Sequence, residues 1–173
     1  MTSSLMINRA PVMTLWAAVV AERLGYDHAA ALTLGKAVAG MNAAAKARRL
    51  RLAEPAKEPA GRKKPPRERT VELLGRLVPV VETKSGLRAV AKERPEDPAA
   101  VERYLAGKFG DALEDVRTAF RALARSRTPA ALAAEAYALY EAFRPAIPEG
   151  VRGWGAAGRL DLALVRKLAT ARR

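Results

Sequence analysis

The segment PVMTLWAAVVAERLG, residues 11–25, predicts the first helix of the fold and the point at which it ends. Pro11 suits a first helical turn, where its missing N–H costs nothing, and Gly25 suits the left-handed residue that follows a helix. The apolar run Val12–Val20 is too short to span a membrane and continues into Glu22 and Arg23, so no membrane span is predicted. The apolar side chains recur at three- and four-residue spacing, as on one face of a helix: Val12, Leu15, Trp16, Val19, Val20 and Leu24.

A second, longer helix is predicted directly after the first, with Asp27 as its N-terminal cap. We therefore predict that residues 1–52 form an N-terminal helical hairpin. Small residues on the opposite face of this helix would let another helix approach closely, and we predict that Gly40 and Ala44 lie at an oligomer interface. The stripe predicted to face the partner helix has a heptad-like spacing: Ala31, Leu34, Val38, Met41 and Ala45.

A helix-turn-helix that reads base edges is the alternative interpretation of this hairpin. Its second helix would need outward side chains that donate or accept hydrogen bonds. Only Thr33, Lys36 and Asn42 are candidates for that role, and the other outward positions are Ala and Gly. A plain packed hairpin is therefore favoured.

Positive charge is concentrated in one short stretch of the chain. The 173 residues include 31 Lys and Arg against 18 Asp and Glu, a formal net charge of +13. Residues 46–69 contain ten basic and three acidic residues, so this basic stretch alone contributes +7. Because Pro55, Pro59, Pro65 and Pro66 interrupt any helix there, we predict an extended linker over residues 53–69 between two folded parts.

The remaining residues, 70–173, are predicted to form a short β-hairpin and then three helices. Leu77–Glu82 and Leu87–Ala91 are strand-like runs on either side of the turn Lys84-Ser85-Gly86, with a helix over Val71–Leu77 as the alternative. The first of these three helices is expected to bend near its glycines, Gly107 and Gly110. The fold class is therefore mainly α: a helical hairpin, a basic linker with a β-hairpin and a C-terminal three-helix group. Capping residues and first-turn prolines predict where the three helices begin: Asp97-Pro98, Thr128-Pro129 and Asp161. The glycines that predict the bend are Gly107 and Gly110.

No catalytic residue, metal ligand or cofactor is predicted, and the chain is not expected to be an enzyme. Residues 153–158 match the glycine pattern of dinucleotide-binding loops but follow no strand. The acidic-x-Lys tripeptide at residues 82–84 has no second carboxylate to hold a metal ion. The acidic cluster at residues 111–115 has cations one turn away, which favours a solvated face. His28 is the only histidine.

The charge pattern predicts nucleic-acid binding, to DNA in preference to RNA, mostly through backbone phosphates. A solvated linker, an Arg- and Ala-rich genome composition and a helical scaffold that self-associates through Gly40 and Ala44 remain as alternatives. Since the chain has no Cys, a cytoplasmic protein is expected. The residues predicted to contact phosphates all lie in the basic stretch: Lys46, Arg48, Arg49, Arg51, Arg62, Lys63, Lys64, Arg67 and Arg69.

Overall fold

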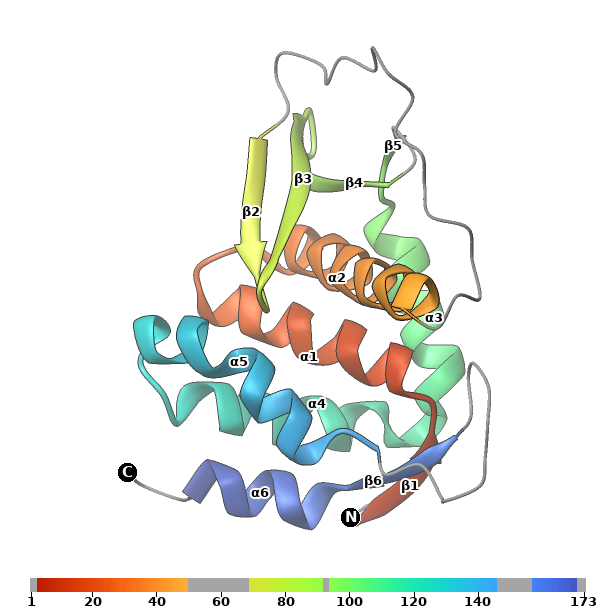
Figure 1. The fold of residues 1–173 in the computed structure, drawn as a ribbon, viewed down its shortest axis with the longest axis vertical. Helices are drawn as coiled ribbons and strands as arrows, with labels where there is room; N and C mark the ends of the chain where they lie inside the picture. The colour runs from red at the N-terminus through yellow and green to blue at the C-terminus, as the bar shows by residue number, and fades with distance from the viewer. Residues whose placement is uncertain (1–2, 50–68, 92–93, 146–156, 171–173) are drawn as a thin grey trace.

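The computed structural model describes residues 3–49, 69–91, 94–145 and 157–170, and arranges their helices around a buried central helix, α1 (Figure 1). A short 3-10 helix, Gly110–Ala112, joins α3 to α4. The helices are α1 (Arg9–Arg23), α2 (His28–Arg49), α3 (Pro98–Phe109), α4 (Leu113–Arg125), α5 (Pro129–Phe143) and α6 (Leu162–Thr170). The strands are β1 (Ser4–Ile7), β2 (Arg69–Leu73), β3 (Arg76–Thr83), β4 (Gly86–Ala91), β5 (Arg94–Pro95) and β6 (Gly158–Asp161).

Helix α1 is buried on every side, whereas the sequence pattern predicted a single apolar face. All residues of Pro11–Ala21 are buried, including Met13 and Ala17, which lie off the predicted stripe. Helix α2 covers one side of α1, while α4 and α5 cover another (Figure 1). A helix that is apolar all round is typical of such a central position.

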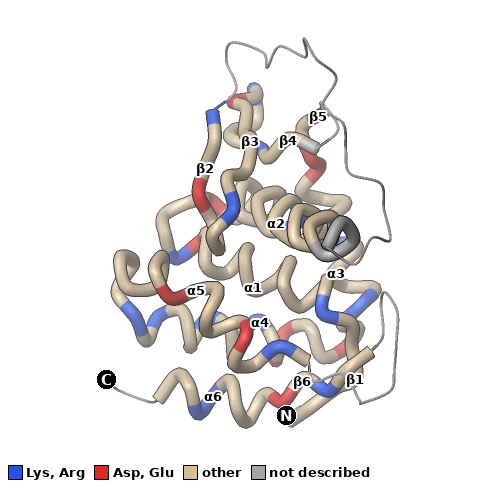
Figure 2. Tube along the Cα trace, viewed as in Figure 1, with Lys and Arg blue, Asp and Glu red and all other residues tan. Residues whose placement is uncertain are grey.

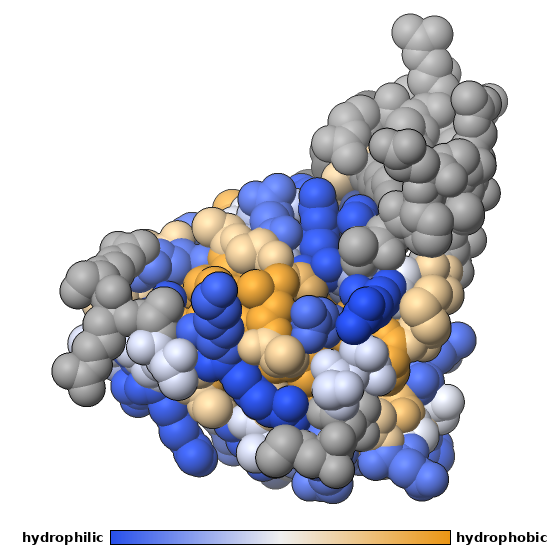
Figure 3. All heavy atoms as spheres, turned by 90° about the horizontal axis from the view of Figure 1, so that it is seen from below, coloured by the Kyte–Doolittle hydropathy of each residue, from blue (hydrophilic) through white to orange (hydrophobic). Residues whose placement is uncertain are grey.

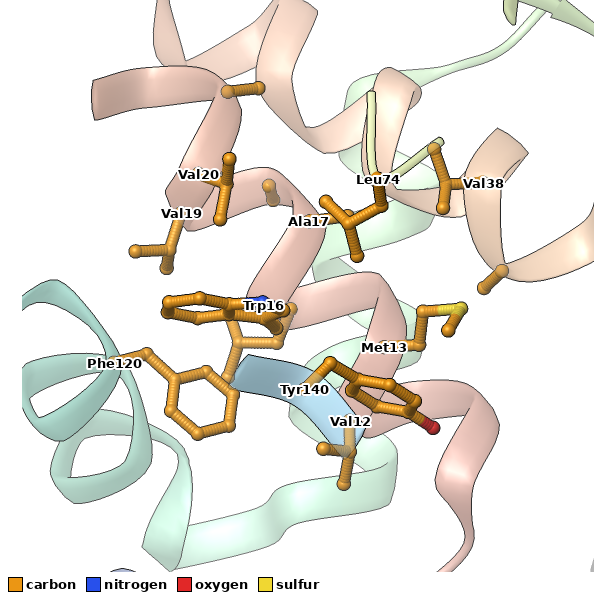
Figure 4. Close-up of a cluster of buried hydrophobic side chains, with 14 of the residues drawn as sticks. Val12, Met13, Trp16, Ala17, Val19, Val20, Val38, Leu74, Phe120 and Tyr140 are labelled. Atoms are coloured by element: carbon orange, nitrogen blue, oxygen red, sulfur yellow. The ribbon is translucent and has the colours of Figure 1, made fainter. Parts of the chain in front are cut away.

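Trp16 fixes α1 to the C-terminal helices at the centre of the core (Figure 4). Its indole ring is fully buried and meets Phe120 and Phe143 edge-on, with ring centroids 5.6 and 5.3 Å away. Its Nε1–H donates a 2.9 Å hydrogen bond to the carbonyl of Ala136 in α5. The N-terminal hairpin and the C-terminal helices therefore share one hydrophobic core.

Helices α1 and α2 approach each other closely at Gly35. A Cβ atom at this position would collide with the carbonyl oxygen of Thr14 and lie 2.9 Å from the amide nitrogen of Ala18.

The turn between α1 and α2 agrees with the prediction. Gly25 has a φ of 111°, and the Asp27 carboxylate accepts a 2.8 Å hydrogen bond from the amide of Ala30.

The middle of the chain forms an antiparallel sheet with strand order β2-β3-β4-β5, packed on α2. The predicted β-hairpin is confirmed by β3 and β4, whose register pairs Thr83 with Gly86. The alternative helix over Val71–Leu77 is wrong. Leu74 and Gly75, both with positive φ, form a tight turn there, so that β2 folds back onto β3.

The C-terminal helices begin where their capping residues predicted. The side chains of Asp97, Thr128 and Asp161 each accept a hydrogen bond from an amide in the first turn that follows, at 3.0, 3.2 and 3.0 Å. The first of these helices is broken at Gly110, whose φ is 57°, so it is divided into α3 and α4. The mainly α fold class is thereby confirmed.

A two-stranded antiparallel pairing of β1 with β6 was not predicted. It joins Ser4–Ile7 to Gly158–Asp161 and lies beside α6 (Figure 1). Within the ranges that the structure describes, no helix combines the length and apolar character needed to cross a bilayer.

Candidate nucleic-acid interface

The structure describes the two ends of the basic stretch. Lys46, Arg48 and Arg49 form part of the last turns of α2, and Arg69 is the first residue of β2. The other predicted contact residues lie outside the described residues: Arg51, Arg62, Lys63, Lys64 and Arg67.

Arg69 forms an ion pair with Glu82 across the β2–β3 pair. Its Nη2 donates to the Glu82 carboxylate at 3.0 Å, and both side chains are 63% exposed. An ion pair this exposed contributes at most about 1 kcal/mol. A phosphate could therefore replace the carboxylate of Glu82 at little cost.

Both ends of the basic stretch are attached to one structural unit, made of α2 and the sheet. Arg76 at the start of β3 donates a 3.0 Å hydrogen bond to the Asn42 side chain of α2. Arg76 pairs with Leu73, four residues along β2 from Arg69, which corresponds to about 13 Å of strand. Figure 2 shows basic positions where the chain enters β2 and at the β3–β4 turn. The unit thus presents cations over a length comparable to about four phosphates of one DNA strand.

The base-reading alternative for α2 loses its candidate side chains. Thr33 was expected to face outward but is fully buried, with its hydroxyl bonded to the Ala30 carbonyl and the Ala89 amide. The Lys36 ammonium lies over the ring of Tyr104, 4.1 Å from its centroid. Asn42 is bonded to Arg76, as described above. Thr33 and Asn42 thus contact the sheet and Lys36 contacts α3, so none of the three side chains extends freely from α2.

The predicted oligomer interface lies on an open face of α2. Gly40 and Ala44 are both exposed, and a Cβ atom at Gly40 would meet nothing within 4 Å. The close helix approach that small residues permit occurs instead at Gly35, which the spacing of small residues did not single out.

Apolar side chains gather on another face of the molecule, which carries β1, β6 and α6 (Figure 3). Leu5, Leu164 and Leu168 are partly buried there, and Met6 of β1 is 63% exposed. Because apolar side chains do not neutralise phosphates, the candidate interface remains on α2 and the sheet.

A tyrosine–arginine cluster lies where α1 begins and α5 ends. Burial raises the pKa of Tyr140 to about 12, even though the positive charges of Arg9 and Arg144 favour its ionised form. Burial, and then the charge of Arg144, lowers the pKa of Arg9. Tyr137 is partly exposed, and its ring centroid lies 6.1 Å from that of Tyr140. Burial therefore favours the neutral form of the Tyr140 hydroxyl and opposes the charged form of the partly buried Arg9.

Sequence reasoning missed a cation cluster that joins α1 to α4. Arg23, Arg121 and Arg125 line a cavity of about 230 Å³ together with Glu22. The Arg121 guanidinium and the Glu22 carboxylate are 3.5 Å apart and 99 positions apart in sequence, so no local motif could have revealed the cluster.

Among the described residues, no group of three or more His, Asp or Glu side chains could hold a metal ion. Glu114 of the acidic cluster is bonded to Arg117 at 3.4 Å. Of the three glycines in the pattern at residues 153–158, only Gly158 lies within the described residues, as the first residue of β6. Comparison of the chain with family models, with curated proteins and with solved structures gave no match.

Proposed function

We propose that the protein binds nucleic acid without catalysing a reaction, and that duplex DNA is preferred to RNA. The observation that supports this function is the basic stretch of residues 46–69, with a net charge of +7, whose two described ends are attached to the unit of α2 and the sheet. We place this binding in the cytoplasm.

The proposed contacts are to phosphates. Each Lys or Arg that neutralises a phosphate releases condensed counterions, so affinity falls steeply as salt is added. Phosphate contacts position a protein on DNA but do not read its sequence. Since Thr33 is buried and Asn42 is engaged with Arg76, we expect little base discrimination from this part of α2.

The experiment is a fluorescence-anisotropy titration of labelled duplex DNA and single-stranded RNA over a series of salt concentrations. A variant with Arg62, Lys63 and Lys64 replaced by Ala should flatten the dependence of log affinity on log salt, by about 0.9 for each duplex phosphate that is no longer neutralised. The matched control replaces Arg103, Arg159 and Lys167, which are exposed and lie outside the basic stretch.

The control removes the same charge, so it separates local contacts from overall attraction. The proposal predicts a flatter slope only for the variant in the basic stretch. Equal slopes for the two variants would contradict it, and so would binding that disappears at physiological salt. Tighter binding of RNA than of DNA would overturn the stated preference alone.

A helical scaffold that self-associates is the second candidate, and it is favoured by the open face around Gly40 and Ala44. A Cβ atom at Gly40 meets nothing within 4 Å in the monomer, so the Gly40→Leu variant should fold normally. If this face is an interface, the variant should be monomeric by light scattering while the wild type is a dimer. A monomeric wild type at high protein concentration would exclude self-association through this face.

A further inference from the structure

The cavity between α1 and α4 is small and rich in guanidinium groups. Its volume of about 230 Å³ is below the range of drug-sized ligand sites and suits a small ion or a single ligand group. It is bounded by residues near the C-terminal ends of both helices: Val19, Glu22, Arg23, Arg121, Ala124 and Arg125.

The side chains around this cavity have more hydrogen-bond donors than acceptors. Nη2 of Arg23 donates to the Arg127 carbonyl at 3.0 Å, but Nε of Arg23 is buried and has no hydrogen-bond partner. Arg121 reaches Glu22 only at 3.5 Å, the outer limit of a hydrogen bond. Arg125 forms no ion pair with any residue in the described part of the chain. A buried unpartnered donor requires an explanation, and a bound ion or water is among the usual ones.

The charge balance of the cavity favours an anion. Three guanidiniums face one carboxylate, and the carboxylate of Glu22 is also bonded to His28 at 2.6 Å. The C-terminal ends of α1 and α4 oppose an anion with about half a negative charge each. The cavity therefore remains positive after both helix ends are included.

We propose that this cavity binds a phosphate group, with the guanidiniums of Arg23, Arg121 and Arg125 donating to its oxygens. Arginine is suited to this ligand because its planar fork of donors matches the geometry of phosphate oxygens. The apolar side chains of Val19 and Ala124 are buried at the same cavity and limit the space to a small group. The proposal does not depend on the basic stretch, because none of the cavity residues belongs to it.

The experiment titrates the full chain with inorganic phosphate by calorimetry, against sodium chloride at the same ionic strength. Saturable binding is expected for the wild type. The Arg125→Gln variant, in which an exposed side chain is changed, and the Arg121→Gln/Arg125→Gln double variant should each weaken that binding at least tenfold. Arg159→Gln, an exposed arginine of β6, is the matched control and should leave it unchanged.

A nuclear magnetic resonance measurement of the Nε–H group of Arg23 reports whether the guanidinium of this residue takes part in binding. Its signal should shift with phosphate and follow the same saturation curve as the calorimetry. The proposal would be overturned if binding were not saturable, if chloride had an equal effect, or if Arg159→Gln lost as much phosphate affinity as the cavity variants. The cavity would then hold only water. Competition by a 5′-phosphorylated oligonucleotide, but not by its 5′-hydroxyl form, would identify a nucleic-acid end as the source of the phosphate. Binding of inorganic phosphate without such competition would identify a small phosphate.

Discussion

The backbone amide of Ala89 in β4 donates a 3.0 Å hydrogen bond to the hydroxyl of Thr33 in α2, 56 positions earlier in the chain. The same hydroxyl donates to the Ala30 carbonyl at 2.8 Å, while the Ala89 carbonyl accepts from the amide of Glu96. A helix side chain therefore satisfies a sheet amide that would otherwise be buried without a partner, and it fixes the sheet on α2.

Replacing Thr33 with Val should lower the free energy of unfolding by about 1–3 kcal/mol, because the buried amide of Ala89 would lose its acceptor. Thr33→Ser keeps the hydroxyl and should recover most of the loss. Denaturant unfolding of the two variants measures the difference. Equal stabilities for Thr33→Val and the wild type would show that the hydrogen bond does not hold the sheet.

Gly35→Ala should destabilise the protein by about 1–3 kcal/mol, since the new methyl group would collide with the backbone of α1. Gly40→Ala, five positions later on the same helix, has open space and should stabilise it by about 0.5–1 kcal/mol. Thermal unfolding should therefore move in opposite directions for the two variants. A loss of stability in both would mean that helix packing is not what distinguishes the two glycines.

Glu82→Gln should increase the affinity for duplex DNA and steepen its salt dependence by about 0.9, because Arg69 would be released for one phosphate contact. The stability of the fold should change by less than about 1 kcal/mol, since the ion pair is exposed. The control is Glu141→Gln in α5, which makes the same charge change on an exposed residue away from the sheet. An equal gain in affinity for both variants would show that the effect comes from the net charge and not from the release of Arg69.

Tyr140 should make stability fall in alkaline solution. Its pKa is raised from 10.0 to about 12 by burial, so the folded state keeps a proton that the unfolded state has lost. This contribution to stability is fully present below pH 10 and is lost as the pH rises to about 12, at no more than about 1.4 kcal/mol per pH unit. The difference in unfolding free energy between the wild type and Tyr140→Phe should therefore vary with pH only in this window. A difference that stays constant up to pH 12 would refute the shift.

Helix starts could be predicted from the sequence because their causes are local. Asp97 and Thr128 cap helices whose first-turn prolines follow them directly, and both side chains accept the expected amides. The strand Arg69–Leu73 was missed for two reasons. Its start lies in the basic stretch, and the turn that follows it places Leu74 in the left-handed conformation. A Gly, Asn or Asp at that position would have indicated such a turn, whereas Leu does not.

Contacts between distant segments could not be predicted in the same way. The pairing of β1 with β6 involves four residues on each side, too few for a clear alternation of apolar and polar positions. Gly35 and Gly40 both fit a pattern of small residues, and only the position of α1 shows which of the two is confined. The arginine-lined cavity likewise depends on the packing of α1 against α4. The basic stretch was evident from composition, and its function stays a prediction.

The burial of Pro11–Ala21 on every side of α1 has a consequence for the synthesis of the protein. The carbonyl that pairs with Trp16 belongs to Ala136, 120 positions later, and the rings of Phe120 and Phe143 are also made late. At ordinary translation rates of about 5–20 residues per second, α1 would leave the ribosome roughly ten seconds before these partners do. During that interval its apolar surface can be covered only in part, by α2. The nascent chain should therefore depend on a chaperone, or on the ribosome surface, until α5 emerges.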